Sequence, residues 1–295
     1  MRHLLIVLSG LSLLTLPLHA QHPPPGFDHP LRVIDSIPAP ESVAVGPDGA
    51  WYVSSFGKFG VKGDGAVYRV DPGKGTREIF APGLDDPCGL LFLGSTLWAA
   101  DREGVYRVTR GKVEQVYAGK DFPRKLHFLN DLAAGRGGTF YVSDTGDSTA
   151  GGHGAVFVLA PGKRPAVLPG SDTVKAQSSP NGLFPGGGDS LYVVGYRTGV
   201  LSVTDGHGSW REMARGLGSP DGIDAAGSDA FYVSDNVGGD LLLVPRRPGG
   251  KPITLAAGLK SPADLIVDHR RGMLVAPENS GNRLSVYRLD HAGTQ

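Results

Sequence analysis

The sequence predicts an all-β fold, a six-bladed β-propeller with four-stranded blades that spans residues 31–290. Three observations lead to this prediction. A unit of turn, apolar run, Gly-rich turn and second apolar run recurs six times, the spacing inside the unit is nearly constant, and the units advance by about the length of a propeller blade. A helical solenoid would need long stretches of 3.6-residue periodicity, and the chain contains none.

Two positions define the register of the six units. One follows the proline, or its equivalent, before the first apolar run, and the other is the first large residue of the second run. They lie 11 residues apart in five units and 10 apart in the second unit, and the first position advances by 47, 42, 51, 40 and 42 residues. The first positions are Glu41, Cys88, Asn130, Asn181, Asp221 and Ala263, and the second are Tyr52, Trp98, Tyr141, Tyr192, Tyr232 and Leu274.

Each unit continues with further strands. Third runs lie at 66–70, 104–108, 155–159, 200–203, 241–244 and 284–288, and fourth runs lie at 77–80, 113–117, 166–168, 210–213 and 253–256. The sixth unit lacks a fourth run, whereas the segment 31–37 precedes the first unit without a partner. We therefore expect this N-terminal strand to become the outer strand of the sixth blade, which closes the ring and hides both open edges.

The first twenty residues differ from the rest of the chain. Arg2 is followed by an apolar stretch from Leu4 and by Ala20, a pattern typical of a secretory signal peptide. We predict a signal peptide at 1–20, a linker at 21–30 and an exported protein, either periplasmic or secreted. An uncleaved membrane anchor is the alternative, but the apolar core is short for a span and is interrupted by Pro17.

Composition narrows the range of partners. The 29 basic residues balance 29 acidic ones and no basic run occurs, so nucleic acid is not an expected partner. No further segment is apolar enough to cross a membrane, and we expect no membrane contact after signal cleavage. The single cysteine, Cys88, excludes an internal disulfide. The expected partner is a small-molecule substrate, and the expected state is a monomer.

The first strand of a propeller blade lines the central channel, so the six first positions form a ring at one end of it. The chain has five asparagines, and two of them, Asn130 and Asn181, join Glu41 and Asp221 in this ring. Two carboxylates and two amide oxygens around one narrow space would repel each other or stay unsatisfied without a cation. The set suits Ca²⁺ or Mg²⁺, and the lack of a ring histidine argues against a dedicated zinc site, although Mn²⁺ or Zn²⁺ could also bind. The alternative is that Pro-Asn-Gly and Pro-Asp-Gly only form turns.

Four segments carry a resemblance to a known family: PESVAV with Glu41, LND with Asn130, SPNGL with Asn181 and SPDGI with Asp221. With the blade pattern, they resemble the regucalcin/gluconolactonase (senescence marker protein) family of calcium-dependent six-bladed propellers. The ring is also similar to that of diisopropylfluorophosphatase and the paraoxonases. The resemblance implies that Glu41, Asn181 and Asp221 bind the metal, that Asn130 contacts metal or substrate beside them, and that Asp221 is the catalytic carboxylate, as general base or nucleophile.

One position departs from the family pattern. Gluconolactonase-type members have an arginine two residues before the LND-type asparagine, where it holds the sugar, and this chain has Phe128 there. We therefore expect a less polar lactone or ester in place of an aldonolactone, with Asn130, Phe128 and His127 as substrate contacts.

The expected function is that of a divalent-metal-dependent hydrolase of lactones or related esters. The alternatives are a phosphotriesterase-like hydrolase at the same site and a non-catalytic propeller of the NHL type, which the blade pattern YVSD resembles. No GxSxG, no HExxH and no usable Ser/His/Asp order is present. Asp101, Asp144 and Asp235, which end second apolar runs, are predicted to cap turns rather than to form a second functional ring.

Overall fold

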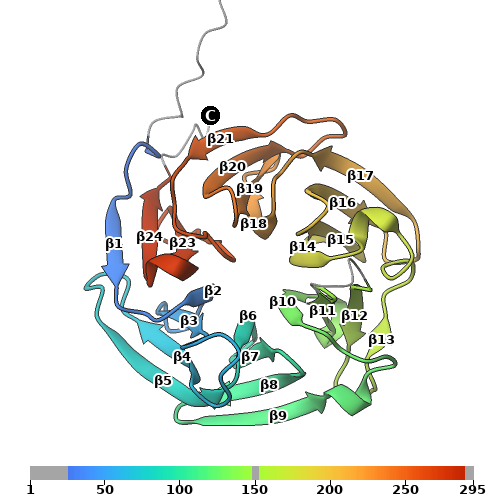
Figure 1. Cartoon of the computed structure of the whole chain (residues 1–295), viewed down its shortest axis with the longest axis horizontal. Helices are drawn as coiled ribbons and strands as arrows, with labels where there is room; N and C mark the ends of the chain where they lie inside the picture. The colour runs from blue at the N-terminus through green and yellow to red at the C-terminus, as the bar shows by residue number, and fades with distance from the viewer. Residues whose placement is uncertain (1–25, 148–152, 290–295) are drawn as a thin grey trace, which may run out of the picture.

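The computed structural model describes residues 26–147 and 153–289 and shows six four-stranded antiparallel sheets around a central channel (Figure 1). The predicted six-bladed β-propeller is therefore confirmed. The predicted signal peptide at 1–20 lies outside the described residues. Within the described ranges, helix is limited to four 3₁₀ turns, none of which has the length or hydropathy of a membrane span: η1 (Gly119–Asp121), η2 (Arg136–Gly138), η3 (Lys175–Gln177) and η4 (Asn279–Gly281).

In the first five blades the strands follow the chain from the channel outwards, and in the sixth the N-terminal strand is the outermost. The first blade contains β2 (Pro40–Val45), β3 (Trp51–Ser55), β4 (Gly65–Val70) and β5 (Arg77–Leu84), and the second contains β6 (Pro87–Leu93), β7 (Thr96–Asp101), β8 (Gly104–Thr109) and β9 (Lys112–Ala118). The third contains β10 (Leu129–Ala134), β11 (Phe140–Asp144), β12 (Ala155–Leu159) and β13 (Ala166–Val167), and the fourth contains β14 (Pro180–Gly187), β15 (Ser190–Gly195), β16 (Val200–Thr204) and β17 (Trp210–Arg215). The fifth contains β18 (Pro220–Ala226), β19 (Ala230–Asp235), β20 (Asp240–Pro245) and β21 (Ile253–Ala256). The sixth contains β22 (Ile266–Asp268), β23 (Met273–Glu278), β24 (Arg283–Arg288) and β1 (Arg32–Asp35).

Aromatic side chains on the second strands pack between neighbouring blades. The ring of Tyr52 lies 4.9 Å from that of Phe80 in its own blade and 5.0 Å from that of Phe92 in the next. Trp98 contacts Phe140 of the following blade in the same way, at a centroid distance of 5.0 Å. Because these residues recur at one position of each unit, the constant register of the sequence produces an apolar cluster at each junction between neighbouring blades.

The segment before β1 is packed against the sixth blade. Phe27, within the range predicted as a linker, is only 6% exposed, and its ring lies 5.4 Å from that of Tyr287 and 6.0 Å from that of Tyr232. These contacts fix the chain just before it enters the sheet.

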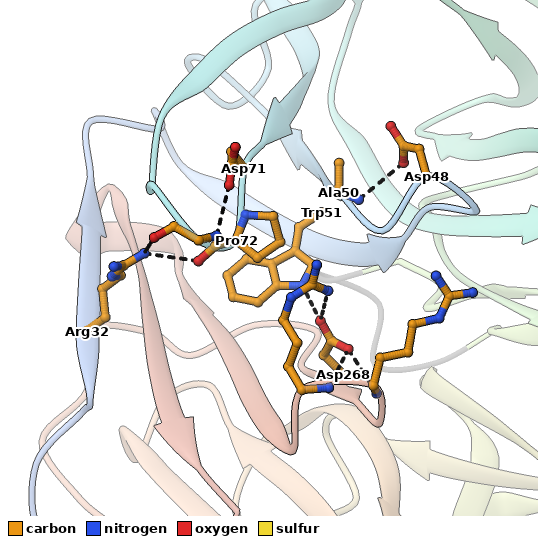
Figure 2. A network of polar contacts seen from close by, with 10 residues as sticks. Arg32, Asp48, Ala50, Trp51, Asp71, Pro72 and Asp268 are labelled. Atoms are coloured by element: carbon orange, nitrogen blue, oxygen red, sulfur yellow. Dashed lines mark hydrogen bonds and ion pairs between the residues drawn. The ribbon is translucent and has the colours of Figure 1, made fainter.

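The sixth blade contains strands from both ends of the described chain. β1 pairs antiparallel with β24, with Arg32 opposite Val286 and Asp35 opposite Arg283. Figure 2 shows the polar contacts that join this blade to the first. Arg32 donates to the carbonyl oxygens of Pro72 and Gly73, at 2.9 and 2.7 Å. Hydrogen bonds therefore connect the N-terminal strand to a blade that begins the ring.

A buried carboxylate completes the junction between the sixth and first blades. The Nε1–H of Trp51, on β3, donates to Asp268 at 2.9 Å, and the Arg271 guanidinium donates to the same carboxylate oxygen at 2.8 Å (Figure 2). Burial opposes ionisation of Asp268, but the hydrogen bonds from Trp51 and Arg271 prevail and lower its pKa. The carboxylate thus stays charged and satisfies an indole N–H that has no access to water.

Asp268→Ala is expected to lower the free energy of unfolding by about 2–4 kcal/mol, because it leaves the Trp51 N–H buried without an acceptor and Arg271 without its partner. The measurement is urea denaturation followed by tryptophan fluorescence. Asp48→Ala is the matched control, since Asp48 pairs with Arg69 at the surface, where such a pair contributes less than about 1 kcal/mol. Equal losses in the two variants would contradict the assigned role of Asp268.

Candidate functional site

The inner strands change their pairing at the ring positions. In the first five blades the ladder between the first and second strands is interrupted after the residue that precedes the ring residue and resumes three residues later. Such an irregularity re-aims side chains and leaves backbone groups to be satisfied in another way. It is therefore the local reason why the ring side chains turn into the channel.

Serine hydroxyls bridge this interruption in three blades. Ser54 accepts the N–H of Ser42 at 2.9 Å and donates to the carbonyl of Cys88 in the next blade at 2.6 Å. Ser234 repeats the arrangement between the fifth and sixth blades, and Ser143 accepts the N–H of Asp131. Each bridge ties a ring strand to its own blade, and two of them also tie it to the neighbour, so the ring is held rigidly.

Four predicted site residues meet at the floor of one cavity. Glu41, Asn130, Asn181 and Asp221 line it and are 3, 5, 3 and 6% exposed. In each of them one oxygen is shielded from solvent and accepts no hydrogen bond: Glu41 Oε2, Asn130 Oδ1, Asn181 Oδ1 and Asp221 Oδ1. Among the described residues only Gln177 has another such oxygen. An unpaired buried oxygen costs about 1–3 kcal/mol, and four of them around one space indicate a missing positive partner.

The electrostatics of the channel lead to the same conclusion. Burial, and then the nearby carboxylates of Asp221, Asp264 and Asp131, raise the pKa of Glu41 well above its usual value. Burial and Asp264 raise the pKa of Asp221 to about 8. Without a cation, the carboxyl group of Asp221 would therefore be largely protonated at neutral pH, and a bound cation would favour the ionised forms of both acids.

The donor set fits a hard divalent cation. Two carboxylates and two amides supply only oxygen ligands, which suits Ca²⁺ or Mg²⁺ with water completing the coordination shell. In the described ranges no three His, Cys, Asp or Glu side chains form a metal-binding group. The candidate site therefore depends on the amide oxygens of Asn130 and Asn181 as much as on the acids.

Two further carboxylates lie one residue beyond ring positions and have structural partners. Asp131 accepts the backbone N–H groups of Leu132 and of Leu183 in the next blade, both at 2.6 Å. Asp264 accepts the hydroxyl of Ser42 at 2.6 Å across the junction of the sixth and first blades. Both carboxyl groups are buried next to the ring positions, but neither lines the cavity.

The remaining ring positions differ from the four polar ones. Ala263 lines the cavity, whereas Cys88 does not, because its side chain is fully buried with Sγ 3.5 Å from the Asp86 carbonyl. The three predicted substrate contacts, Asn130, Phe128 and His127, all line the cavity. Their contact with a substrate stays a prediction.

The carboxylates that end second strands act as turn caps, as predicted. Asp101 accepts the N–H of Asp86, Asp144 that of Phe128, and Asp235 that of Ser219, at 2.8–2.9 Å. Glu278 does the same for Lys260 at 2.7 Å. These bonds fix the segment that enters each inner strand, and through it the ring residue two or three positions later.

A second circle of cavity residues escaped the sequence analysis. The residue directly after each second strand lines the cavity in all six blades, and we call this set the rim: Phe56, Arg102, Thr145, Tyr196, Asn236 and Asn279. The rim backbone is fixed by hydrogen bonds such as Tyr196 N–H to Ser179 O, at 2.9 Å. In the sequence only their position identifies the rim residues. Each lies four or five residues after the first large residue of the second apolar run of its unit.

The ring and the rim enclose a cavity of about 540 Å³. This volume is sufficient for a small organic molecule above the four unpaired oxygens. Tyr196 and Asn236 are joined by a 3.0 Å hydrogen bond from the phenol to the amide oxygen, which orders one wall.

Solved structures with a similar fold include a gluconolactonase, a protein described as a putative gluconolactonase, and a lyase. The gluconolactonase from Xanthomonas campestris is 19% identical with a TM-score of 0.66, over 88% of this chain and 90% of that one. A putative gluconolactonase is 18% identical with a TM-score of 0.63, over 92% and 96%. Virginiamycin B lyase from Staphylococcus aureus is 12% identical with a TM-score of 0.60, over 84% and 80%. No protein-family model and no curated protein matches the chain. At these identities the similarity is one of fold.

Proposed function

We propose that this protein is a divalent-metal-dependent hydrolase of lactones or related esters, exported from the cytoplasm and acting on a small molecule as a monomer. The observation that carries the proposal is the set of four unpaired, solvent-shielded oxygens at the floor of an open cavity. The fold shared with one gluconolactonase and one putative gluconolactonase supports the proposal.

The polar ring residues would serve both cation binding and catalysis. Glu41, Asn181, Asp221 and Asn130 would hold the cation, with Ca²⁺ the first candidate and Mg²⁺, Mn²⁺ and Zn²⁺ the others. A cation bound there would polarise the substrate carbonyl and stabilise the negative charge that develops on its oxygen. Asp221 would also act, from its place beside the cation, as general base toward a water molecule or as the nucleophile.

The same geometry explains why the substrate should be an activated carbonyl. A carboxylate beside a cation is a weak base, because the positive charge lowers its pKa. Such a base suits a lactone or ester better than an amide. His127 and Phe128, on the segment that enters β10, and Asn130, near the start of β10, would contact the substrate.

The proposal is tested with the mature protein on a panel of lactones, aryl esters and an aryl phosphotriester. We expect lactone or ester turnover that EDTA abolishes and that Ca²⁺ restores to at least half of the starting rate. Turnover of the phosphotriester alone would favour a phosphotriesterase. No turnover of any substrate, with Ca²⁺ still raising the melting temperature, would favour a non-catalytic binding propeller.

A further inference from the structure

The walls of the cavity differ in chemistry from one side to the other. Over the fourth, fifth and sixth blades the rim carries hydrogen-bonding side chains: Tyr196, Asn236 and Asn279. On the side of the first and second blades the rim consists of Phe56 and Arg102, and two further phenylalanines join them. A substrate that enters the cavity therefore meets a polar wall on one side and an aromatic wall on the other.

The aromatic wall is a contiguous cluster. The ring of Phe59 lies 5.7 Å from that of Phe56 and 5.8 Å from that of Phe128, although the three residues come from two different loops. The guanidinium carbon of Arg102 lies 5.1 Å from the Phe59 ring centre and 5.8 Å from that of Phe128. These distances are within the range of ring–ring and cation–π contacts.

A buried carboxylate fixes this wall. Asp86, whose side chain is 1% exposed, accepts the N–H of Gly60 at 2.7 Å and pairs with Arg102 at 3.5 Å. Gly60 has a φ of +81°, a conformation that favours glycine, and it lies next to Phe59 in the loop between β3 and β4. One carboxylate thus positions both the loop that carries Phe59 and the guanidinium beside it.

The wall leaves apolar surface uncovered. Phe59 is 61% exposed and Phe128 is partly exposed, and both line the cavity. A well-fixed aromatic surface in a cavity loses its hydration when an apolar group covers it, which is favourable. A sugar lactone placed there would instead bury hydroxyl groups against Phe128 without partners.

We propose that Phe56, Phe59, Phe128 and Arg102 form a specificity subsite that binds an aryl group on the non-reacting part of the substrate. The link to catalysis rests on the proposed hydrolase function, whereas the subsite itself rests on the geometry of the wall. The aryl group packs against Phe59 and Phe128, and Arg102 covers its edge. The substrate carbonyl then reaches the proposed cation site, which Glu41, Asn130, Asn181 and Asp221 form at the floor of the same cavity.

The test compares γ-phenyl-γ-butyrolactone with γ-butyrolactone, which share the same lactone ring and differ by the phenyl group. In the wild type we expect kcat/KM to be about ten- to a hundredfold higher for the phenyl lactone, the range expected for burying one large apolar group. Phe59→Ala and Phe128→Ala should each reduce that ratio about tenfold, and Phe128→Leu should retain part of it. Val237→Ala is the control, because Val237 is 73% exposed, follows rim residue Asn236 and does not line the cavity; it should keep the wild-type ratio.

Calorimetric titration of the phenyl lactone into EDTA-treated protein separates the two proposals. Hydrolysis of neither lactone, with binding of the phenyl lactone that Phe59→Ala weakens about tenfold, would remove the hydrolase and retain the subsite. Hydrolysis of both lactones with equal kcat/KM, and a ratio unchanged in Phe59→Ala and Phe128→Ala, would overturn the subsite and retain the hydrolase.

Discussion

Asp221→Asn is expected to reduce kcat/KM for lactone hydrolysis by about 10²–10⁴-fold, the usual contribution of a positioned base or nucleophile, while the protein stays folded. The amide keeps the shape of the side chain but cannot accept a proton or attack a carbonyl. In EDTA at pH 8 the same variant should melt a few degrees higher than the wild type, because a neutral amide removes a buried carboxyl whose pKa is raised to about 8. Steady-state kinetics and a thermal melt measure the two effects.

Asp264→Asn is the matched control for this experiment. Asp264 is also a buried channel carboxylate with a raised pKa, about 7, because of burial, but it bonds to Ser42 and does not line the cavity. We expect its activity to stay within about threefold of the wild type. If both variants lost activity equally, the loss would reflect the channel as a whole and Asp221 would have no catalytic role of its own.

The stability of the metal-free protein is expected to fall as the pH rises from about 4 to about 8. The folded protein keeps Asp221 and Asp264 protonated up to about pH 8 and 7, whereas the unfolded chain releases these protons near pH 4. Deprotonation therefore favours the unfolded chain across this window, and the stabilisation present at low pH is lost through the folded pKa. The total effect is on the order of several kcal/mol, or roughly 10 °C in the melting temperature.

The measurement is a series of melting curves in EDTA from pH 4.5 to 9, repeated with 5 mM CaCl₂. Calcium should raise the melting temperature most at high pH, because cation binding there displaces few protons. Asp221→Asn should show a shallower pH dependence in EDTA than the wild type. A melting temperature in EDTA that is independent of pH would mean that the buried carboxyl groups are stabilised by other partners.

The fold and the floor of the site could be predicted because both depend on repetition. Six copies of one unit fixed the register, and the register brought Glu41, Asn130, Asn181 and Asp221 together without any structural information. The turn-capping role of Asp101, Asp144 and Asp235 followed from the same spacing. A rare residue type that recurs at equivalent positions of the units can be recognised in a sequence. Asn130 and Asn181, two of only five asparagines in the chain, are such a case.

The rim and the aromatic wall could not be predicted because they depend on loop conformation. The six rim residues share a position but no chemistry, so no residue type marks them. The contact of Phe59 with Phe128 needs a loop whose shape is set by Gly60 and by a hydrogen bond to Asp86, a residue 26 positions away. Phe128 is visible in the sequence as a departure from a family pattern, but no sequence feature marks Phe56 and Phe59 as its neighbours.

The pairing of β1 with β24 has a consequence for how the protein is made. A ribosome synthesises Arg32 first and Val286 some 250 residues later, yet the two face each other in one ladder. Until the last strand emerges, β1 has no partner and the nascent ring has two open sheet edges, which invite association with other chains. The sixth blade can therefore form only at the end of translation. Keeping the chain unfolded until then would prevent its open sheet edges from associating with other chains.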